Sequence, residues 1–175
     1  PVGPVKIGSR MEAVAMPPGS TGTIYVAPAS GNLFKSVNNG LTWRPVFEHE
    51  SAFAIGDVAV AASNPAVVWV GTGEAQPRFA GYAYSGTGVF KSTNGGESWT
   101  SMRLAGTDHI GKVLIHPTNS DIVYVAAIGR QWSANAERGV YRTTDGGAHW
   151  ERVLFIDDST GVVDLAIDPS NPATV

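Results

Sequence analysis

The stretch Gly88-Val-Phe-Lys-Ser-Thr-Asn-Gly-Gly-Glu-Ser-Trp99 decides the fold, because the chain contains it in three versions. An earlier version is Asn32-Leu-Phe-Lys-Ser-Val-Asn-Asn-Gly-Leu-Thr-Trp43, and a later one is Gly139-Val-Tyr-Arg-Thr-Thr-Asp-Gly-Gly-Ala-His-Trp150. All three share the pattern Ser/Thr-x-Asn/Asp-x-Gly-x-x-Trp, which begins at residues 36, 92 and 143. Self-similarity with a period of about 50 residues predicts a propeller or a solenoid.

Each version predicts a short strand, a polar turn and a second strand that a tryptophan opens. The Asn or Asp side chain can hydrogen-bond the backbone two residues further on, and the glycine can adopt the positive φ of a tight hairpin. The tryptophan supplies apolar area that fixes the hairpin on a core. We call residues 36–43, 92–99 and 143–150 the tryptophan turns, and we interpret them as structural. Their shared residues are Ser36, Asn38, Gly40, Trp43, Ser92, Asn94, Gly96, Trp99, Thr143, Asp145, Gly147 and Trp150.

The composition excludes several classes of function. Hydrophobic residues make up 43% of the 175 residues, so a core is available, and the net charge is −3 without a basic block, which argues against a nucleic-acid partner. No apolar run approaches the ~18 residues of a membrane span. The chain has no cysteine, so disulfides and thiolate metal sites are excluded. The four histidines lack metal-ligand spacing, and we expect neither a metal nor a cofactor.

The pattern of short apolar runs predicts an all-β fold. After a lead-in over residues 1–9, four-stranded units are expected at residues 10–47, 55–104 and 110–155, and residues 162–175 supply the first strand of an incomplete fourth unit. The first strand of each unit, at 55–60, 110–115 and 162–167, is almost wholly apolar, which is typical of a strand buried on both faces. We therefore expect a partial β-propeller of four-stranded antiparallel blades, with three full blades and one further strand.

Three blades do not close a ring, and an open arc would expose strand edges and apolar blade faces. Either the rest of a longer chain or further copies of the same chain must complete the circle. The sequence stops within a repeat at Val175, which favours the longer chain.

The tryptophan turn resembles the Asp-box, or BNR repeat, of sialidases, sortilin-type receptors, family 74 xyloglucanases and photosystem II assembly factors. The phrases Trp69-Val-Gly-Thr-Gly-Glu74, Asp121-Ile-Val-Tyr-Val-Ala126 and Thr160-Gly-Val-Val-Asp164 are most similar to the sortilin-like N-terminal propeller of large secreted bacterial proteins, which are often labelled glycosyl hydrolases. The resemblance implies a secreted or periplasmic protein. The first two turns carry Asn where the family prefers Asp.

A propeller gathers the tryptophan turns on one face and places the longer connections, at residues 48–54, 74–87, 105–109, 130–138 and 157–160, on the opposite face, which we call the loop face. Long loops are often functional. Aromatic side chains can stack on a sugar or peptide while charges orient it, and the alternative is a solvated rim with weak ion pairs. The candidate ligand-binding residues are Glu74, Arg78, Tyr82, Arg130 and Trp132.

Four residues share one position near the start of the inner strand of each unit, and we expect them to line the mouth of the central channel. They are Glu12, Asp57, Lys112 and Asp164. Such a group could bind a cation or polarise a substrate, or it could serve only solubility.

Three functions follow from these observations. The first is an extracellular or periplasmic module that recognises a protein segment or a glycan through the loop face. The second is a glycoside hydrolase, which needs carboxylates ~5–5.5 Å or ~6.5–9.5 Å apart, with candidates Glu74, Asp57 and Asp164 besides Asp108 and Asp157. Family 74 enzymes carry their first catalytic aspartate beside an Asp-Val-Gly-Gly phrase, and the equivalent stretch Ala27-Pro-Ala-Ser-Gly31 has no acid. The third is a scaffold of the assembly-factor kind.

Overall fold

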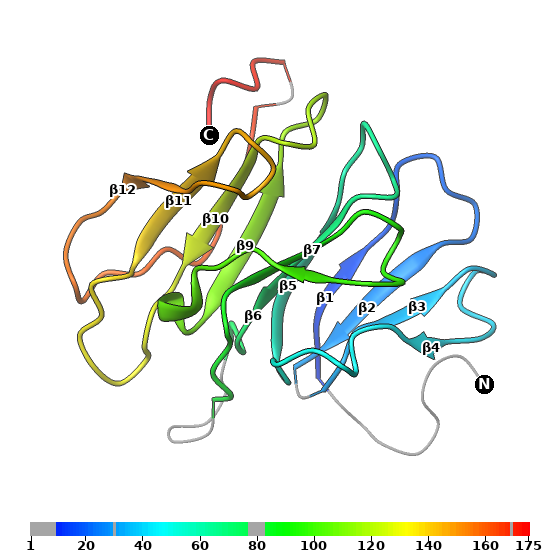
Figure 1. The fold of residues 1–175 in the computed structure, drawn as a ribbon, viewed down its shortest axis with the longest axis horizontal. Coiled ribbons are helices and arrows are strands. Elements are labelled where there is room, and N and C mark those ends of the chain that lie inside the picture. The colour runs from blue at the N-terminus through cyan, green and yellow to red at the C-terminus, as the bar shows by residue number, and fades with distance from the viewer. Residues whose placement is uncertain (1–9, 30, 77–82, 169) are drawn as a thin grey trace.

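The computed structural model of the chain describes residues 10–29, 31–76, 83–168 and 170–175. The described residues form three four-stranded sheets, and every neighbouring pair of strands within a sheet is antiparallel (Figure 1). Strands follow one another across each sheet in chain order. The expected all-β architecture of four-stranded blades is therefore confirmed.

The blades have the following bounds. Blade 1 holds β1 (Met11–Ala15), β2 (Ile24–Pro28), β3 (Phe34–Ser36) and β4 (Arg44–Pro45). Blade 2 holds β5 (Ile55–Val60), β6 (Val68–Thr72), β7 (Val89–Ser92) and β8 (Thr100–Ser101), and the short 3-10 helix η1 (Ala105–Thr107) follows it. Blade 3 holds β9 (Ile110–Ile115), β10 (Val123–Ala127), β11 (Gly139–Thr143) and β12 (Glu151–Leu154).

The inner strand β5 packs against both other inner strands, β1 on one side and β9 on the other. Their apolar sequences suit this place, and Ile55 and Ile110 are fully buried. The approach is close enough that a Cβ atom at Gly56 would collide with the carbonyl oxygen of Ile110. Glycine is therefore required where the inner strands of blades 2 and 3 touch.

The core lies between the blades as two separate clusters. Between blades 1 and 2, the Phe47 ring meets the rings of Phe90 and Trp99 edge-on, with centroids 5.1 and 5.2 Å apart. Between blades 2 and 3, Trp69 meets Trp150 edge-on at 6.0 Å. Each buried side chain of this size contributes about 1.5–3 kcal/mol, so the stacking of blades is the main source of stability.

The three tryptophan turns have the same hydrogen bonds. The hydroxyls of Ser36, Ser92 and Thr143 accept from the backbone N–H four residues on at 2.9, 2.8 and 2.9 Å. The Oδ1 atoms at the third position of the pattern likewise accept from the N–H four residues later, at 2.9, 3.0 and 3.0 Å. Because every bond is local, the pattern of the sequence determines the shape of the turn.

The turns and the long connections lie at opposite ends of the blades. Figure 1 shows the β11–β12 turn at the end where β9 connects to β10, and the β6–β7 and β10–β11 connections at the other end. The loop face of the sequence analysis is thus formed by connections from different blades.

Two expectations differ from the structure. Residues 162–167 do not form the expected strand. An inner strand needs the second strand of its own blade as a hydrogen-bonding neighbour, and the residues described after 167 do not form one. The segment still lies against blade 3: the Val162 N–H donates to the Ala127 carbonyl at the end of β10 at 3.1 Å, and Val163 packs against Gly111 of β9. The outer strands, expected at 42–47 and 98–104, shorten to β4 and β8, since Pro45 lacks an N–H and Arg103 has a positive φ of 73°.

Candidate functional site

The β6–β7 and β10–β11 connections meet on the loop face around a hollow of about 290 Å³. Arg130 and Trp132, both predicted to bind ligand, lie together on its wall. The indole of Trp132 is 67% exposed, although tryptophan is usually well buried. The hollow is lined by Ala83, Ser85, Asp108, His109, Arg130, Gln131, Trp132 and Ser133.

The hollow also contains a buried histidine next to a carboxylate. Asp108 has an unusual backbone conformation for a non-glycine residue, with φ 59° and ψ −58°, and such strain is often found at functional sites. His109 Nε2 lies 3.3 Å from the Asp108 carboxylate. Burial lowers the pKa of His109, and the Asp108 charge opposes this only in part, so the imidazole is neutral at pH 7.

Arg138 holds the loop that presents Trp132. Its guanidinium donates to the carbonyls of Asp158 and Ser133 at 2.8 and 3.2 Å, and also to those of Ile128 and Arg130. These bonds span the connection from β10 to β11 and reach the segment that follows β12. Arg138 therefore positions the loop, and Trp132 is held on a supported backbone.

An aromatic row extends from this hollow towards blade 1. The rings of Phe53 and Tyr84 meet at 5.4 Å and are 57% and 54% exposed. Tyr84 lies between Ala83 and Ser85, which line the hollow of Trp132. We call Phe53, Tyr84 and Trp132 the aromatic row. Phe53 also borders a second hollow of about 410 Å³. No sequence pattern predicts its role, because nothing distinguishes a single Phe in a short loop.

Glu74 does not lie on the surface of the loop face. Its side chain is buried and forms an ion pair with Arg10, which also contacts Glu12 at 3.1 Å. The hydrogen bond that the Arg10 guanidinium donates to the Glu74 carboxylate raises the pKa of Arg10. Glu74 contacts the loop of Trp132 through its backbone carbonyl, which accepts a hydrogen bond from Gln131 Nε2 at 3.4 Å. The candidates Arg78 and Tyr82 lie outside the described residues.

The four residues expected at the channel mouth do meet, around a hollow of about 520 Å³ that includes Glu12, Asp57, Lys112 and Asp164. Asp57 accepts from the Val113 N–H at 2.8 Å and lies 3.4 Å from Lys112 Nζ, and burial raises its pKa. Within the described part of the chain, no group of three or more acidic or histidine side chains is placed to hold a metal ion.

The carboxylates proposed for hydrolysis mostly have structural partners. Glu74 pairs with Arg10 and Asp57 with Val113 and Lys112. Asp157 caps a turn, accepting from the N–H groups of Ser159 and Thr160 at 2.8 and 2.6 Å, and the first of these bonds lowers its pKa most. Asp164 is exposed and bonds only the N–H of Leu165 among the hydrogen bonds described.

The three stacked sheets place the chain among β-propeller proteins. Similar solved structures include an ancestral GH74 enzyme, with 28% identity, a TM-score of 0.65 and coverage of 86% of this chain but 19% of that chain. GH74 of Niastella koreensis matches at 21% identity and a TM-score of 0.65 over 92% of this chain and 25% of its own. YCF48 of Cyanidioschyzon merolae matches at 17% identity and a TM-score of 0.56, over 89% of this chain and 41% of its own.

The chain spans less than half the length of each of these proteins. No protein-family model and no curated protein sequence matches it. Among the residues that the structure describes, no helix has the length and apolar character needed to cross a membrane. The comparisons therefore support the propeller architecture and a relationship to GH74 enzymes, and the likeness to YCF48 shows the shared fold.

Proposed function

We propose that this chain is part of a sortilin-like, Asp-box propeller that binds an extended ligand, a glycan or a protein segment, along the loop face without cleaving it. The observation that carries the proposal is the aromatic row of Phe53, Tyr84 and Trp132, each more than half exposed. Exposed aromatic side chains on one face mark interaction sites more often than scattered apolar residues do. The resemblance to secreted bacterial proteins further supports a secreted or periplasmic location.

The chemistry of the row suits a ligand with flat apolar faces and polar edges. The rings offer surfaces for stacking, and Arg130 and Asp108 add one charge of each sign beside Trp132. Hollows of about 290 and 410 Å³ border the two ends of the row, within or near the size range of ligand sites. An elongated ligand that crosses both blades would contact all three rings.

Binding without turnover agrees with the hydrogen bonds and ion pairs that hold the candidate catalytic carboxylates. Two-carboxylate hydrolysis needs side chains free to exchange protons or attack, whereas Glu74 and Asp57 are held by Arg10, Val113 and Lys112. A hydrolase remains the second candidate, because the ancestral GH74 enzyme is 28% identical over 86% of this chain. The candidates left for that function are Asp164, which is exposed at the channel mouth, and Asp108, which lines the hollow of Trp132.

A scaffold is the third candidate. One similar structure is YCF48 bound to D1 peptide, with 15% identity and a TM-score of 0.58. Peptide binding is a property of that protein, and the present chain shares the fold with it. A protein segment laid along the aromatic row would be the corresponding function here.

The decisive experiment measures binding and turnover together. Wild-type chain is applied to glycan and peptide arrays, and xyloglucan is assayed for released reducing ends. We expect a ligand that binds without turnover and whose affinity falls at least about tenfold in Trp132→Ala, since losing one stacking contact costs about 1.4 kcal/mol or more.

Phe155→Ala is the matched control, because Phe155 is also a partly exposed aromatic residue but follows β12 at the outer edge of blade 3. Binding that both variants retain would contradict the proposal. Release of reducing ends by the wild type, lost in Asp164→Asn, would establish the hydrolase instead.

A further inference from the structure

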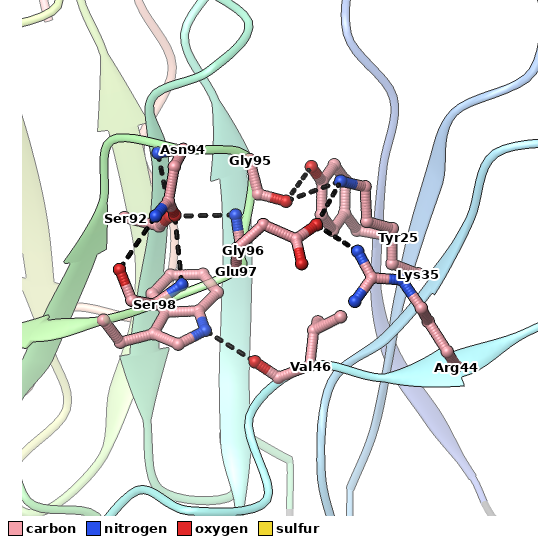
Figure 2. A network of polar contacts seen from close by, with 11 residues as sticks. Tyr25, Lys35, Arg44, Val46, Ser92, Asn94, Gly95, Gly96, Glu97 and Ser98 are labelled. Carbon is pink, nitrogen blue, oxygen red and sulfur yellow. Dashed lines mark hydrogen bonds and ion pairs between the residues drawn. The ribbon is translucent and has the colours of Figure 1, made fainter.

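The joint between blades 1 and 2 contains side chains of each blade that bond backbone atoms of the other. Lys35 Nζ and the Tyr25 hydroxyl both donate to the Gly95 carbonyl, at 2.7 and 2.9 Å. In return, Trp99 Nε1 donates to the Val46 carbonyl at 2.6 Å. Figure 2 shows how the second tryptophan turn lies against blade 1 through these contacts.

The joint between blades 2 and 3 repeats this arrangement. Lys91 Nζ donates to the Gly146 carbonyl at 3.1 Å, and Trp150 Nε1 donates to the Met102 carbonyl at 2.8 Å. Val46 and Met102, which accept from the two indoles, each follow the tryptophan of their own blade by three residues. The two joints can therefore be compared position by position.

Glu97 has its countercharges within the first joint. Its carboxylate lies 3.5 Å from Lys35 Nζ and also pairs with the Arg44 guanidinium (Figure 2). Arg44 lines a small hollow of about 150 Å³ together with Glu48 and Glu50, but the carboxylate with which it forms its ion pair is that of Glu97. The charges near the second tryptophan turn are thus balanced inside the chain.

The loop after β4 carries two carboxylates that are not balanced in this way. Glu48 lies 3.5 Å from the exposed ring of His49, which is charged only when protonated. No lysine or arginine in the described ranges forms an ion pair with Glu48 or Glu50. Counted from the tryptophan, Leu104 and Gly106 occupy the corresponding places in blade 2. The blade architecture therefore does not require acids here.

Both carboxylates border the hollow of about 410 Å³ on the loop face, where Phe53 stands in a fixed position. Tyr84 of blade 2 meets its ring at 5.4 Å, and a Cβ atom at Gly31 would stand 3.1 Å from its Cζ. The hydroxyls of Ser51 and Thr87, 3.3 Å apart, join the same loop to blade 2. Phe53 is nevertheless 57% exposed, so an aromatic ring is held beside two negative charges.

We propose that this hollow receives the lysine or arginine side chain of a protein segment. The inference rests on the proposed function and narrows its ligand to a protein segment with a basic residue. A cation is attracted to the face of an aromatic ring, and a carboxylate accepts a strong charge-assisted hydrogen bond from it. A glycan could offer hydroxyls to Glu48 and Glu50 but no positive charge to balance them.

The other end of the aromatic row has no such preference. Beside Trp132, Asp108 and Arg130 supply one charge of each sign, so the residue that stacks on the indole is not selected by its charge. The row therefore has a direction. A segment that crosses the loop face places its basic residue at Phe53, on the blade 1 side, and an apolar or aromatic residue at Trp132.

The test is a peptide array that presents each sequence twice, once with its lysines and arginines and once with glutamine in their place. The full chain is applied, and the tightest pair is measured by calorimetry in solution. We expect the basic peptide to bind at least about tenfold more tightly than its glutamine version. The double variant Glu48→Gln with Glu50→Gln should remove most of this ratio, and Phe53→Leu should reduce it.

Glu97→Gln is the matched control. It removes one negative charge from the same joint, but from a carboxylate that Lys35 and Arg44 already neutralise. This variant should keep the preference for the basic peptide, and circular dichroism of every variant verifies the fold. A preference that Glu97→Gln lowers as much as the double variant does would assign the effect to net charge and overturn the inference.

Other outcomes separate this inference from the proposed function. Equal binding of the basic and glutamine peptides, lowered in both by Trp132→Ala, would overturn the inference and leave the proposed function intact. Binding of glycans alone would have the same meaning. A chain that binds neither peptides nor glycans would refute the proposed function, and the inference with it.

Discussion

The carboxylate of Asp57, on the inner strand of blade 2, accepts a hydrogen bond from the backbone N–H of Val113, on the inner strand of blade 3, at 2.8 Å. Asp57 thereby joins two sheets whose residues are far apart in the sequence. Lys112 Nζ, 3.4 Å away, balances its charge. This bond gives Asp57 a structural role at the place where sequence analysis suggested catalysis.

The pH dependence of stability tests this role. Burial raises the pKa of Asp57, against the opposing effects of the Val113 N–H and Lys112. As the pH rises above about 4, the unfolded chain therefore loses this proton first, and the contribution of Asp57 to stability falls until the folded pKa is passed. Asp57→Asn keeps an acceptor for Val113 but does not titrate.

Urea unfolding of both proteins at a series of pH values measures the difference. The wild type should lose stability relative to Asp57→Asn as the pH rises from about 4. A difference in the free energy of unfolding between the two proteins that does not change with pH would contradict the raised pKa of Asp57.

Tyr25 and Tyr124 hold equivalent positions and test the energy of a blade joint. The hydroxyl of Tyr25 bonds the Gly95 carbonyl in a buried joint, whereas Tyr124 faces the outer flank of blade 3. Tyr25→Phe should lower the free energy of unfolding by about 1 kcal/mol. Tyr124→Phe should change it by less than about 0.5 kcal/mol. Equal effects in chemical denaturation would show that the joint bond contributes nothing specific.

Asp145 should make the third tryptophan turn sensitive to acid. The backbone N–H of His149, then its ring and the Thr143 hydroxyl, hold the pKa of this carboxyl far below its usual range. Its contribution is present above the unfolded pKa of about 4 and is lost as the pH falls below it. The unfolding midpoint of the wild type should therefore fall relative to Asp145→Asn between about pH 5 and pH 2. Parallel pH profiles would refute this.

Glu74→Gln should separate structure from chemistry. Without the Glu74 charge, Arg10 loses one of its two buried carboxylate partners and keeps Glu12, and we expect a stability loss of about 1–3 kcal/mol. Ligand affinity on the loop face should remain the same. Glu48→Gln, next to the exposed His49, is the control and should be nearly neutral in thermal unfolding. Loss of turnover in Glu74→Gln, with stability retained, would give Glu74 a catalytic role.

Much of the fold could be predicted from the sequence because the repeat uses local interactions. The tryptophan turns close through bonds between residues two and four apart, and the apolar run 55–60 coincides with β5. The strand expected at 162–167 is different, because a strand requires a neighbour and not only a suitable sequence. Residues 162–168 have the composition of an inner strand without the strand that would pair with them.

The candidate site was predictable only in part. Arg130 and Trp132 meet because one loop carries both, and the channel-mouth group meets because its members share a repeat position. The partnership of Glu74 with Arg10 crosses 64 residues and two blades, and no spacing rule indicates it. The lysines at 35 and 91 did carry a signal, since they occupy equal positions in the repeat.

Four acceptors in the joints are main-chain carbonyls, those of Gly95, Val46, Gly146 and Met102, beside the carboxylates of Glu97 and Asp121. A carbonyl is present whatever side chain its residue carries, so a blade places few demands on the identity of its neighbour. Duplication or deletion of a whole blade in a gene would therefore still leave neighbouring blades able to form these hydrogen bonds. Ring size in such proteins can change in evolution without coordinated substitutions on both sides of each new boundary.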